Sequence, residues 1–374
     1  MMDEEKRHLE DLPRRAENGM DGRDPVARSA DGDGLFINPG GGPVPQTRSE
    51  PEQVYEARLA QTNASAWNQV GTGRFRRRRR ALPLMLFLLT CVSTFFVGAT
   101  LWAPLYYLEI AVRSESLMPV RQTIAGHWQP GLIYMGCLLA ILLTHEMGHF
   151  LATVRYRIPA SYPYFLPLPI NPLGTMGAVI GMDGLRANRR QLFDIGIAGP
   201  LAGLLVAIPI MWIGIQQLDF TQPASGPFQM DVPLVVRWWL DANQPRGYTP
   251  GQVIAQSQLN AYFMAGWVGL FVTGLNMIPV SQLDGGHVTY TMFGKPAHWI
   301  ARIFMLVWVL TMVFELTSRL LWLMPLLILL MGTDHPKTSD DSIELGWGRK
   351  TLGLLSLSIP FLCFAPKFIL LPGS

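Results

Sequence analysis

The sequence predicts an all-α, polytopic membrane protein, and three features of its 374 residues support this fold class. Charged residues make up only 15% of the chain and hydrophobic residues 49%, whereas an ordinary soluble domain has about 25% charged residues. Several uncharged apolar runs reach the length of about 20 residues that spans a bilayer. An arginine run stands directly before the first of them. This composition argues against a soluble enzyme, and the net charge of only +3 argues against nucleic-acid binding.

Residues 1–80 are expected to form a disordered tail on the cytoplasmic side. They hold 14 of the 30 Lys and Arg residues and 13 of the 27 Asp and Glu residues, with few large apolar side chains. We expect neither a signal peptide, because no apolar run precedes Ala81, nor an organelle transit peptide, because acids are frequent. The tail ends in Arg76 to Arg80. This run is typical of a topogenic signal beside a membrane helix, and the alternative is a patch for nucleic acid or anionic lipid.

Residues 81–371 are expected to form the membrane domain, with six or seven spans. The stretch 302–332 sets the number, because Glu315 and Arg319 interrupt it. It reads either as one long helix or as a hairpin of two, and we favour the hairpin and seven spans. The candidate spans are 81–103, 130–152, 195–215, 259–279, 302–332 and 351–371.

The distribution of Lys and Arg between the loops predicts the orientation. With seven spans, the segments on the N-terminal side hold 15 Lys and Arg residues and the opposite loops hold 4. Positive loops stay in the cytoplasm, so the N-terminus is expected there. A bacterial cytoplasmic membrane is the default location for such a multi-pass protein.

The second candidate span carries the motif His-Glu-x-x-His. His145, Glu146 and His149 are its only ionisable residues. On a helix, the two histidines lie on one face and can bind one Zn²⁺, while the glutamate can act as a general base. The composition gives roughly 0.004 such matches by chance. The alternative is a polar trio that only forms hydrogen bonds between helices, but ionisable groups inside a membrane are costly and usually functional.

A catalytic zinc site usually has three protein ligands, and Asp284 is the expected third. Pro279 should end the preceding helix, and Gly285 with Gly286 permits a close backbone approach. The chain can therefore bring Asp284 back toward the two histidines. His287 is an alternative ligand, and Asp284 would otherwise be a turn residue.

These motifs together resemble the site-2 protease family of intramembrane zinc metalloproteases (M50 type). The resemblance rests on His145 to His149 and on Asn276-x-x-Pro279-x-x-x-x-Asp284-Gly285. Two further segments agree, the Ala-Gly-Pro helix at 196–203 and the glycine-containing segment at 174–180. The match covers about residues 131–288, so the catalytic core is expected at about 130–290. It is closest to the branch without inserted PDZ or CBS domains, which includes plant plastid members.

The resemblance implies one Zn²⁺ per chain on His145, His149 and Asp284. It makes Glu146 the general base and then the acid, and it gives Asn276 a contact with the substrate. The residue type agrees, since an amide can donate a hydrogen bond to a developing oxyanion. The alternative for Asn276 is a polar link between helices.

A small β-strand or re-entrant segment is expected near the active site, because a substrate helix must be unwound before it can be cut. Gly174, Gly177, Ala178 and Val179 are the candidate substrate-binding residues. An edge strand there could hold the substrate extended by β-addition. The alternative is a loop or hairpin that packs against the helices.

The sequence thus predicts an intramembrane zinc endopeptidase that cuts in or near the transmembrane segments of membrane proteins, as in regulated intramembrane proteolysis. Its expected partners are a transmembrane protein substrate and the lipid bilayer, with no nucleic acid, and nothing in the sequence specifies an oligomeric state. One alternative is an inactive scaffold that binds client helices, although such a chain would usually lack a ligand or the base. The other is a metal-ion transporter, which should carry a second ionisable cluster in its spans.

Overall fold

The structure is a computed structural model, and it describes residues 81–182, 184–314, 335–365 and 369–370. The chain divides into two compact units, Met1–Arg76 and Arg77–Ser374, and every described residue belongs to the second. The expected tail at 1–80 and the interruption of the 302–332 stretch at Glu315 lie outside the described residues.

The described part is mostly helical, and four helices are long and apolar enough to cross a membrane. They are α2 (Ala81–Ala99), α5 (Trp128–Arg155), α6 (Arg189–Gln216) and α10 (Pro296–Val313). Each coincides with an apolar run of the sequence. The expectation of a helical integral membrane protein is confirmed at this level, and the number of six or seven spans stays a prediction.

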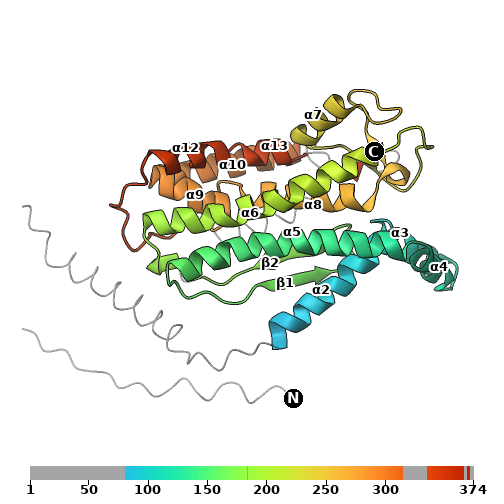
Figure 1. Ribbon diagram of the computed structural model, residues 1–374, viewed down its shortest axis with the longest axis horizontal. Coiled ribbons are helices and arrows are strands. Elements are labelled where there is room, and N and C mark those ends of the chain that lie inside the picture. The colour runs from blue at the N-terminus through green and yellow to red at the C-terminus, as the bar shows by residue number, and fades with distance from the viewer. Residues whose placement is uncertain (1–80, 183, 315–334, 366–368, 371–374) are drawn as a thin grey trace, which may run out of the picture. The chain divides into compact units, whose positions relative to one another are not determined.

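Helices α5, α6 and α8 (Ala261–Asn276) pack side by side and form the centre of the fold (Figure 1). Glycines make the approach of α8 to α6 possible. A Cβ added to Gly214 would lie 2.3 Å from the backbone nitrogen of Phe263, and one added to Gly266 would lie 2.7 Å from the backbone of Met211. Backbone-to-backbone contact of this kind is how small residues hold membrane helices together.

Helix α8 is shorter than the run 259–279 from which a span was expected. Asn260 begins it, because its side chain accepts a hydrogen bond from the backbone nitrogen of Phe263. Its 16 residues are about 24 Å long. After α8 the chain turns at residues 277–283 into α9 (Asp284–Phe293), so the turn that was expected at Pro279 is present.

The run 351–371 does not form one membrane-spanning helix, so that expectation is wrong. The structure has α12 (Trp347–Ser356), then α13 (Ile359–Cys363), and later the short strand β5 (Ile369–Leu370). Pro360 lies in the first turn of α13, where its missing N–H costs nothing. The run is apolar except for Lys367 and three hydroxyl residues, and its helix is interrupted before the proline.

A β-hairpin follows α5 and packs against α2 and α5 (Figure 1). Its strands β1 (Tyr164–Leu168) and β2 (Gly174–Val179) are antiparallel. Ser93 of α2 donates a hydrogen bond to the carbonyl of Gly174 (2.6 Å), and the buried Tyr134 of α5 donates one to the carbonyl of Leu173 (2.9 Å). The two helices therefore fix the turn of the hairpin.

Shorter elements complete the described fold. The turn from α2 to α5 contains α3 (Pro104–Arg113) and α4 (Met118–Gly126). The segment between α6 and α8 contains β3 (Gln229–Met230), α7 (Leu234–Asn243) and β4 (Ile254–Ala255), and the strands form a sheet of order β4-β3-β5. Single 3-10 turns lie at Gly184–Arg186 and Gln256–Gln258.

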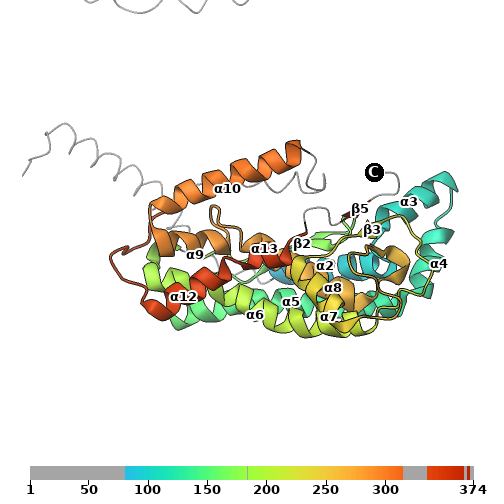
Figure 2. The same ribbon diagram turned by 90° about the horizontal axis from the view of Figure 1, so that it is seen from above.

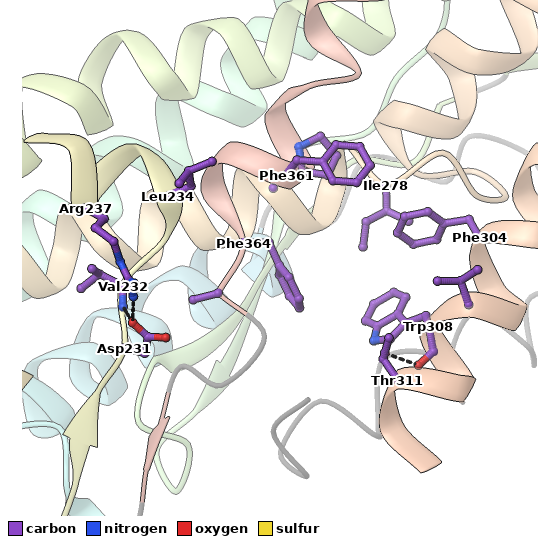
Figure 3. Close-up of a pocket in the computed structure, with 14 residues that line it drawn as sticks. Asp231, Val232, Leu234, Arg237, Ile278, Phe304, Trp308, Thr311, Phe361 and Phe364 are labelled. Atoms are coloured by element: carbon purple, nitrogen blue, oxygen red, sulfur yellow. Dashed lines mark hydrogen bonds and ion pairs between the residues drawn. The ribbon is translucent and has the colours of Figure 1, made fainter. Parts of the chain in front are cut away.

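Helix α10 packs on α9 and stands apart from α5 and α6 in the view of Figure 2. A cavity of about 490 Å³ lies beside it. Figure 3 shows Phe304 and Trp308 of α10 on one side of this cavity and Phe361 and Phe364 on the other. Aromatic and aliphatic side chains make up most of the lining, and Asp231 and Arg237 form an ion pair at one end.

Candidate metal centre and active site

Helix α5 presents the His-Glu-x-x-His motif to the interior of the fold. His145 and Glu146 are only 3% and 6% exposed. The side chain of His149 is 12% exposed. One helical turn separates the two histidines, so their rings lie on the same face, with centroids 5.0 Å apart. The sequence expectation that the motif lies on a helix is confirmed.

Helix α6 covers this face of α5 at very short range, and glycines make that possible. A Cβ added to Gly199 would lie 2.0 Å from Nε2 of His149, and one added to Gly203 would lie 3.0 Å from Nδ1 of His145. In the other direction, a Cβ on Gly148 would lie 2.5 Å from the carbonyl oxygen of Ala198. The two helices meet at the motif because neither carries a side chain at these contacts.

The turn from α8 to α9 brings Asp284 to the same place. Asp284 is the first residue of α9. Behind it, a Cβ on Gly285 would lie 2.0 Å from the carbonyl oxygen of Met277, and one on Gly286 would lie 2.3 Å from that of Ser281. The two glycines let the turn fold back against the helix that it leads into, as expected from the sequence.

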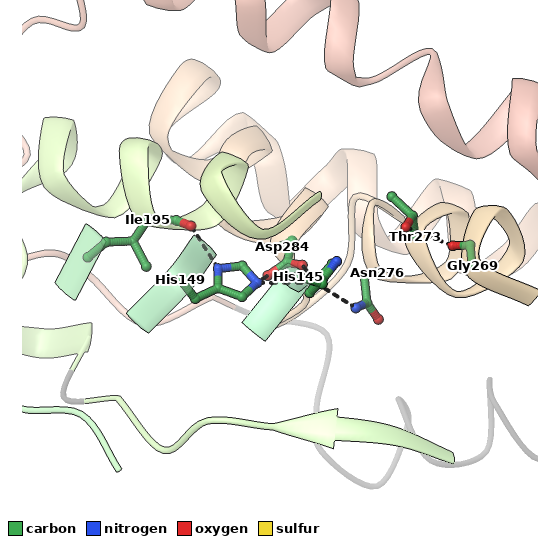
Figure 4. A network of polar contacts seen from close by, with 7 residues as sticks. All are labelled: His145, His149, Ile195, Gly269, Thr273, Asn276 and Asp284. Atoms are coloured by element: carbon green, nitrogen blue, oxygen red, sulfur yellow. Dashed lines mark hydrogen bonds and ion pairs between the residues drawn. The ribbon is translucent and has the colours of Figure 1, made fainter. Parts of the chain in front are cut away.

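Three potential ligand atoms converge at this point (Figure 4). Nε2 of His145 and Nε2 of His149 are 3.2 Å apart. Nε2 of His145 lies 3.3 Å from Oδ2 of Asp284, and Nε2 of His149 lies 3.3 Å from Oδ1. Ligand atoms about 2.0–2.2 Å from one tetrahedral zinc ion are about 3.3–3.6 Å apart. The nitrogen and carboxylate donors therefore fit a zinc ion in type, number and spacing.

The proton on His149 can be assigned from its second ring nitrogen. Nδ1 lies 2.8 Å from the carbonyl oxygen of Ile195 in α6 (Figure 4). Because a carbonyl only accepts hydrogen bonds, Nδ1 carries a proton, so Nε2 is the ring nitrogen that can bind a metal. Such a backbone partner orients a metal-binding imidazole. This partner could not be predicted from the sequence, because every residue has a backbone carbonyl.

Asn276, the last residue of α8, reaches the same group. Its Nδ2 lies 3.2 Å from Nε2 of His145 (Figure 4). The amide is thus beside the ligand atoms, as expected for a residue that contacts the reacting part of a substrate. Glu146 is adjacent to His145 in sequence and points about 100° further around the helix.

His287, the alternative ligand, lies outside the group of converging atoms. In the described part of the chain, the only such group of three consists of His145, His149 and Asp284. Nδ1 of His287 lies instead 2.6 Å from Nε2 of His335. The candidate substrate-binding residues lie on β2, where Gly174 is buried, Gly177 has a φ of +95° and Val179 is 56% exposed.

No sequence pattern pointed to an ion-pair network that lies near the centre. Arg349 of α12 donates two hydrogen bonds to the carboxylate of Asp194, at 2.7 and 2.8 Å, and Tyr156 donates a third. Burial and the neighbouring carboxylate raise the pKa of the Tyr156 phenol. The network joins the end of α5 to α6 and α12, beside the residue whose carbonyl holds His149.

Residues 133–314 match the family model described as peptidase family M50. This segment is similar to peptidase family M50. Similar curated proteins include the "Probable zinc metalloprotease EGY1, chloroplastic" of Oryza sativa subsp. japonica, at 31% identity over 58% of this chain and 38% of the relative. The protein of the same name from Arabidopsis thaliana is 31% identical over 61% of this chain and 42% of the relative. The resemblance to the site-2 protease family is thereby confirmed.

The chain spans about two fifths of the length of these relatives. Their printed names imply zinc as the metal, in agreement with the donor set of the site. The same names describe chloroplastic proteins, so they do not support a bacterial membrane as the location of this chain. No solved structure matches the chain.

Proposed function

We propose that this protein is a zinc endopeptidase that cuts membrane proteins in or near their transmembrane segments. The observation that supports this most is the convergence of His145, His149 and Asp284 beside the buried Glu146. Two neutral imidazoles and a carboxylate all offer lone pairs to one point, and a divalent cation offsets their mutual repulsion. Glu146 follows His145 directly in the chain. Hydrolysis needs a group near the metal site that accepts and donates a proton, and Glu146 can serve as this group.

His145, His149 and Asp284 hold the zinc ion in this proposal, with one ion per chain. Bound there, zinc supplies Lewis-acid polarisation of the scissile carbonyl and makes water more acidic. Glu146 takes a proton from the attacking water on a carboxylate oxygen. It then gives a proton to the nitrogen of the leaving amine, so that the new carboxyl and amino termini balance the water consumed.

Asn276 has a role in the transition state. Its Nδ2 carries two donor hydrogens and lies 3.2 Å from Nε2 of His145. A carbonyl that reacts beside the ligand atoms becomes an oxyanion within reach of this amide. Stabilisation by such a donor is worth about 3–4 kcal/mol in hydrolases of other folds.

The β-hairpin provides the substrate-binding edge. Strand β2 is the outer strand of a two-stranded sheet, so its second edge is free of strand partners within the described residues. An extended peptide can add to such an edge through main-chain hydrogen bonds. Gly174, Gly177, Ala178 and Val179 are the proposed contacts, and Val179 is the most exposed of them, at 56%.

The test is the substitution Glu146→Gln, with cleavage of a co-expressed membrane protein substrate as the measurement. Glutamine keeps the shape of the side chain but cannot accept the proton, so we expect activity to fall by about 10²–10⁴-fold. Zinc content should stay at one ion per chain, because Glu146 is not a ligand.

The control is Glu115→Gln, which changes an exposed glutamate near α3 and should cleave like the parent. Parent-like cleavage by Glu146→Gln would contradict the proposed mechanism. A parent protein that holds zinc and cleaves no membrane substrate would favour the alternative of an inactive scaffold that binds client helices.

A further inference from the structure

A segment that is distant in sequence from α6 and α9 crosses both helices close to the proposed metal centre. We call residues 335–345 the strap; it has no helix or strand and leads into α12. It follows the last residue of α9 by about forty positions in the chain, yet it is bonded to both helices. None of its residues belongs to the proposed catalytic group.

The strap is fixed to the start of α6 by main-chain contacts. The backbone nitrogen of Ser339 donates to the carbonyl of Ala187 (3.0 Å), and the backbone nitrogen of Arg189 donates to the carbonyl of Asp340 (3.2 Å). Leu345 closes the strap at 1% exposure, in a cluster that contains Phe193 of α6 and Val288 of α9. The strap is thus a built part of the fold.

Two side chains of the strap contact α9 directly. Nε2 of His335 lies 2.6 Å from Nδ1 of His287, and the carboxylate of Asp341 accepts a hydrogen bond of 2.9 Å from the hydroxyl of Tyr290. Burial and this carboxylate raise the pKa of Tyr290 to about 12, so the phenol remains a donor. The ring of Tyr290 also stacks on His335, with centroids 4.4 Å apart.

The direction of the His335–His287 hydrogen bond follows from the second nitrogen of His335. Nδ1 lies 2.5 Å from the carbonyl oxygen of Pro336 and therefore carries the proton. Burial lowers the pKa of His335, which keeps the ring neutral. Its Nε2 is then an acceptor, and His287 donates to it.

His287 and Asp284 are seated on the same glycine of α6. They are three residues apart on α9, and a Cβ added to Gly196 would lie 2.9 Å from Cβ of His287 and 3.4 Å from the carbonyl oxygen of Asp284. The carbonyl of the preceding Ile195 holds His149. The position of α9 on α6 at this glycine therefore sets where the Asp284 carboxylate stands relative to His149.

We propose that His335 is a positioning residue for the metal ligand Asp284, acting through its hydrogen bond with His287. This inference rests on the proposed function, because it assumes that Asp284 binds zinc. His335 holds His287, His287 holds the first turn of α9 on α6, and that turn carries Asp284. Without the acceptor at residue 335, Asp284 remains on the chain but is less well ordered at the centre.

The experiment measures the zinc affinity of the purified full chain by competition with a chelator of known affinity. We expect His335→Ala to weaken zinc binding by up to about 10-fold, because partners bonded directly to a metal ligand are worth about 10–100-fold and His335 acts one contact further away, through His287. His335→Gln should restore most of the affinity, because its carboxamide oxygen can accept the hydrogen bond from His287. This rescue distinguishes a positioning role from a general loss of stability. Glutamine can restore the hydrogen bond, but it does not restore the packing of the imidazole ring in this buried site.

The matched control is His298→Ala. This imidazole also stacks on Tyr290, with centroids 6.0 Å apart, but in the described part of the chain its buried Nε2 has no hydrogen-bond partner. We expect it to bind zinc like the parent. Parent-like affinity in His335→Ala, or a His335→Gln variant no better than His335→Ala, would overturn the positioning role. A parent protein that binds no zinc would instead overturn the proposed function, so the two failures are distinct.

Discussion

At the scale of single residues, the short distance between α5 and α6 depends on glycines of α6, which have no side chain at the contact. Gly199 stands directly over the imidazole of His149, where a Cβ would be 2.0 Å from Nε2. No rotation of the ring avoids this contact without breaking the hydrogen bond of Nδ1 to Ile195. One methyl group at this position therefore displaces either the helix or the ligand atom.

We predict that Gly199→Ala removes zinc binding and destabilises the protein by about 1–3 kcal/mol, the usual cost of adding a methyl group to a packed contact. Zinc content after purification and the thermal unfolding of the protein in detergent measure the two effects. The matched control is Gly136→Ala, on the exposed side of α5, where an added Cβ meets nothing within 4 Å. If Gly199→Ala kept one zinc ion per chain, the close approach of α6 would be unimportant for the site.

The proposed ligands could be predicted from the sequence, whereas the residues that hold them could not. His145, His149 and Asp284 stand out because ionisable side chains are rare in apolar runs and their spacing matches a helix and a turn. Ile195 acts through its carbonyl, which every residue has. His335 lies 48 positions from its partner His287, and a pair at that separation leaves no periodic pattern.

At the scale of elements, apolarity predicted the helices better than it predicted their continuity. Helices α2, α5 and α6 agree with the expected apolar runs, and α6 continues even through Pro200 and Pro209. The run 351–371 is equally apolar, but it contains Ser356, Ser358 and Pro360 in succession. The hydroxyls donate instead to carbonyls three residues back, and the proline begins a new helix, so one run gives two short helices.

The proposal for substrate binding depends on the β-hairpin. It is anchored on one side, by Ser93 and Tyr134, and the side chains of Met176 and Val179 are 45% and 56% exposed. An anchored strand with an exposed edge is suited to receive a peptide, because little conformational entropy is lost on binding.

We predict that a photo-crosslinker in place of Val179 captures a membrane protein substrate when Glu146→Gln prevents its cleavage. The measurement is the yield of the crosslinked product on a gel. The control places the same group at Val92, which is 66% exposed on α2 and therefore reports random collisions in the membrane. Equal yields at both positions would contradict substrate binding at β2.

At the scale of the whole chain, the contacts that build the proposed centre come from a limited stretch. The proposed metal ligands, the carbonyl that orients His149 and the strap all lie between His145 and Leu345. The match to peptidase family M50 covers residues 133–314, so the strap extends the centre beyond the matched segment. The N-terminal residues 1–80 are the most highly charged part of the chain and contribute no ligand to the three that converge.

We therefore predict that a chain from which residues 1–73 are removed binds zinc with unchanged affinity. The arginine run that begins at Arg74 is kept, because positive charge beside the first span sets how the chain inserts in the membrane. Chelator competition on the purified truncated chain measures the affinity, and fractionation confirms that the chain still reaches the membrane. In a companion chain, Arg76 to Arg80 are replaced by Gln. We expect this chain to insert incorrectly in the membrane, so it distinguishes an effect on insertion from an effect on metal binding. Weaker zinc binding by a correctly inserted truncated chain would mean that the N-terminal residues support the centre, and the self-contained site inferred from the contacts would be wrong.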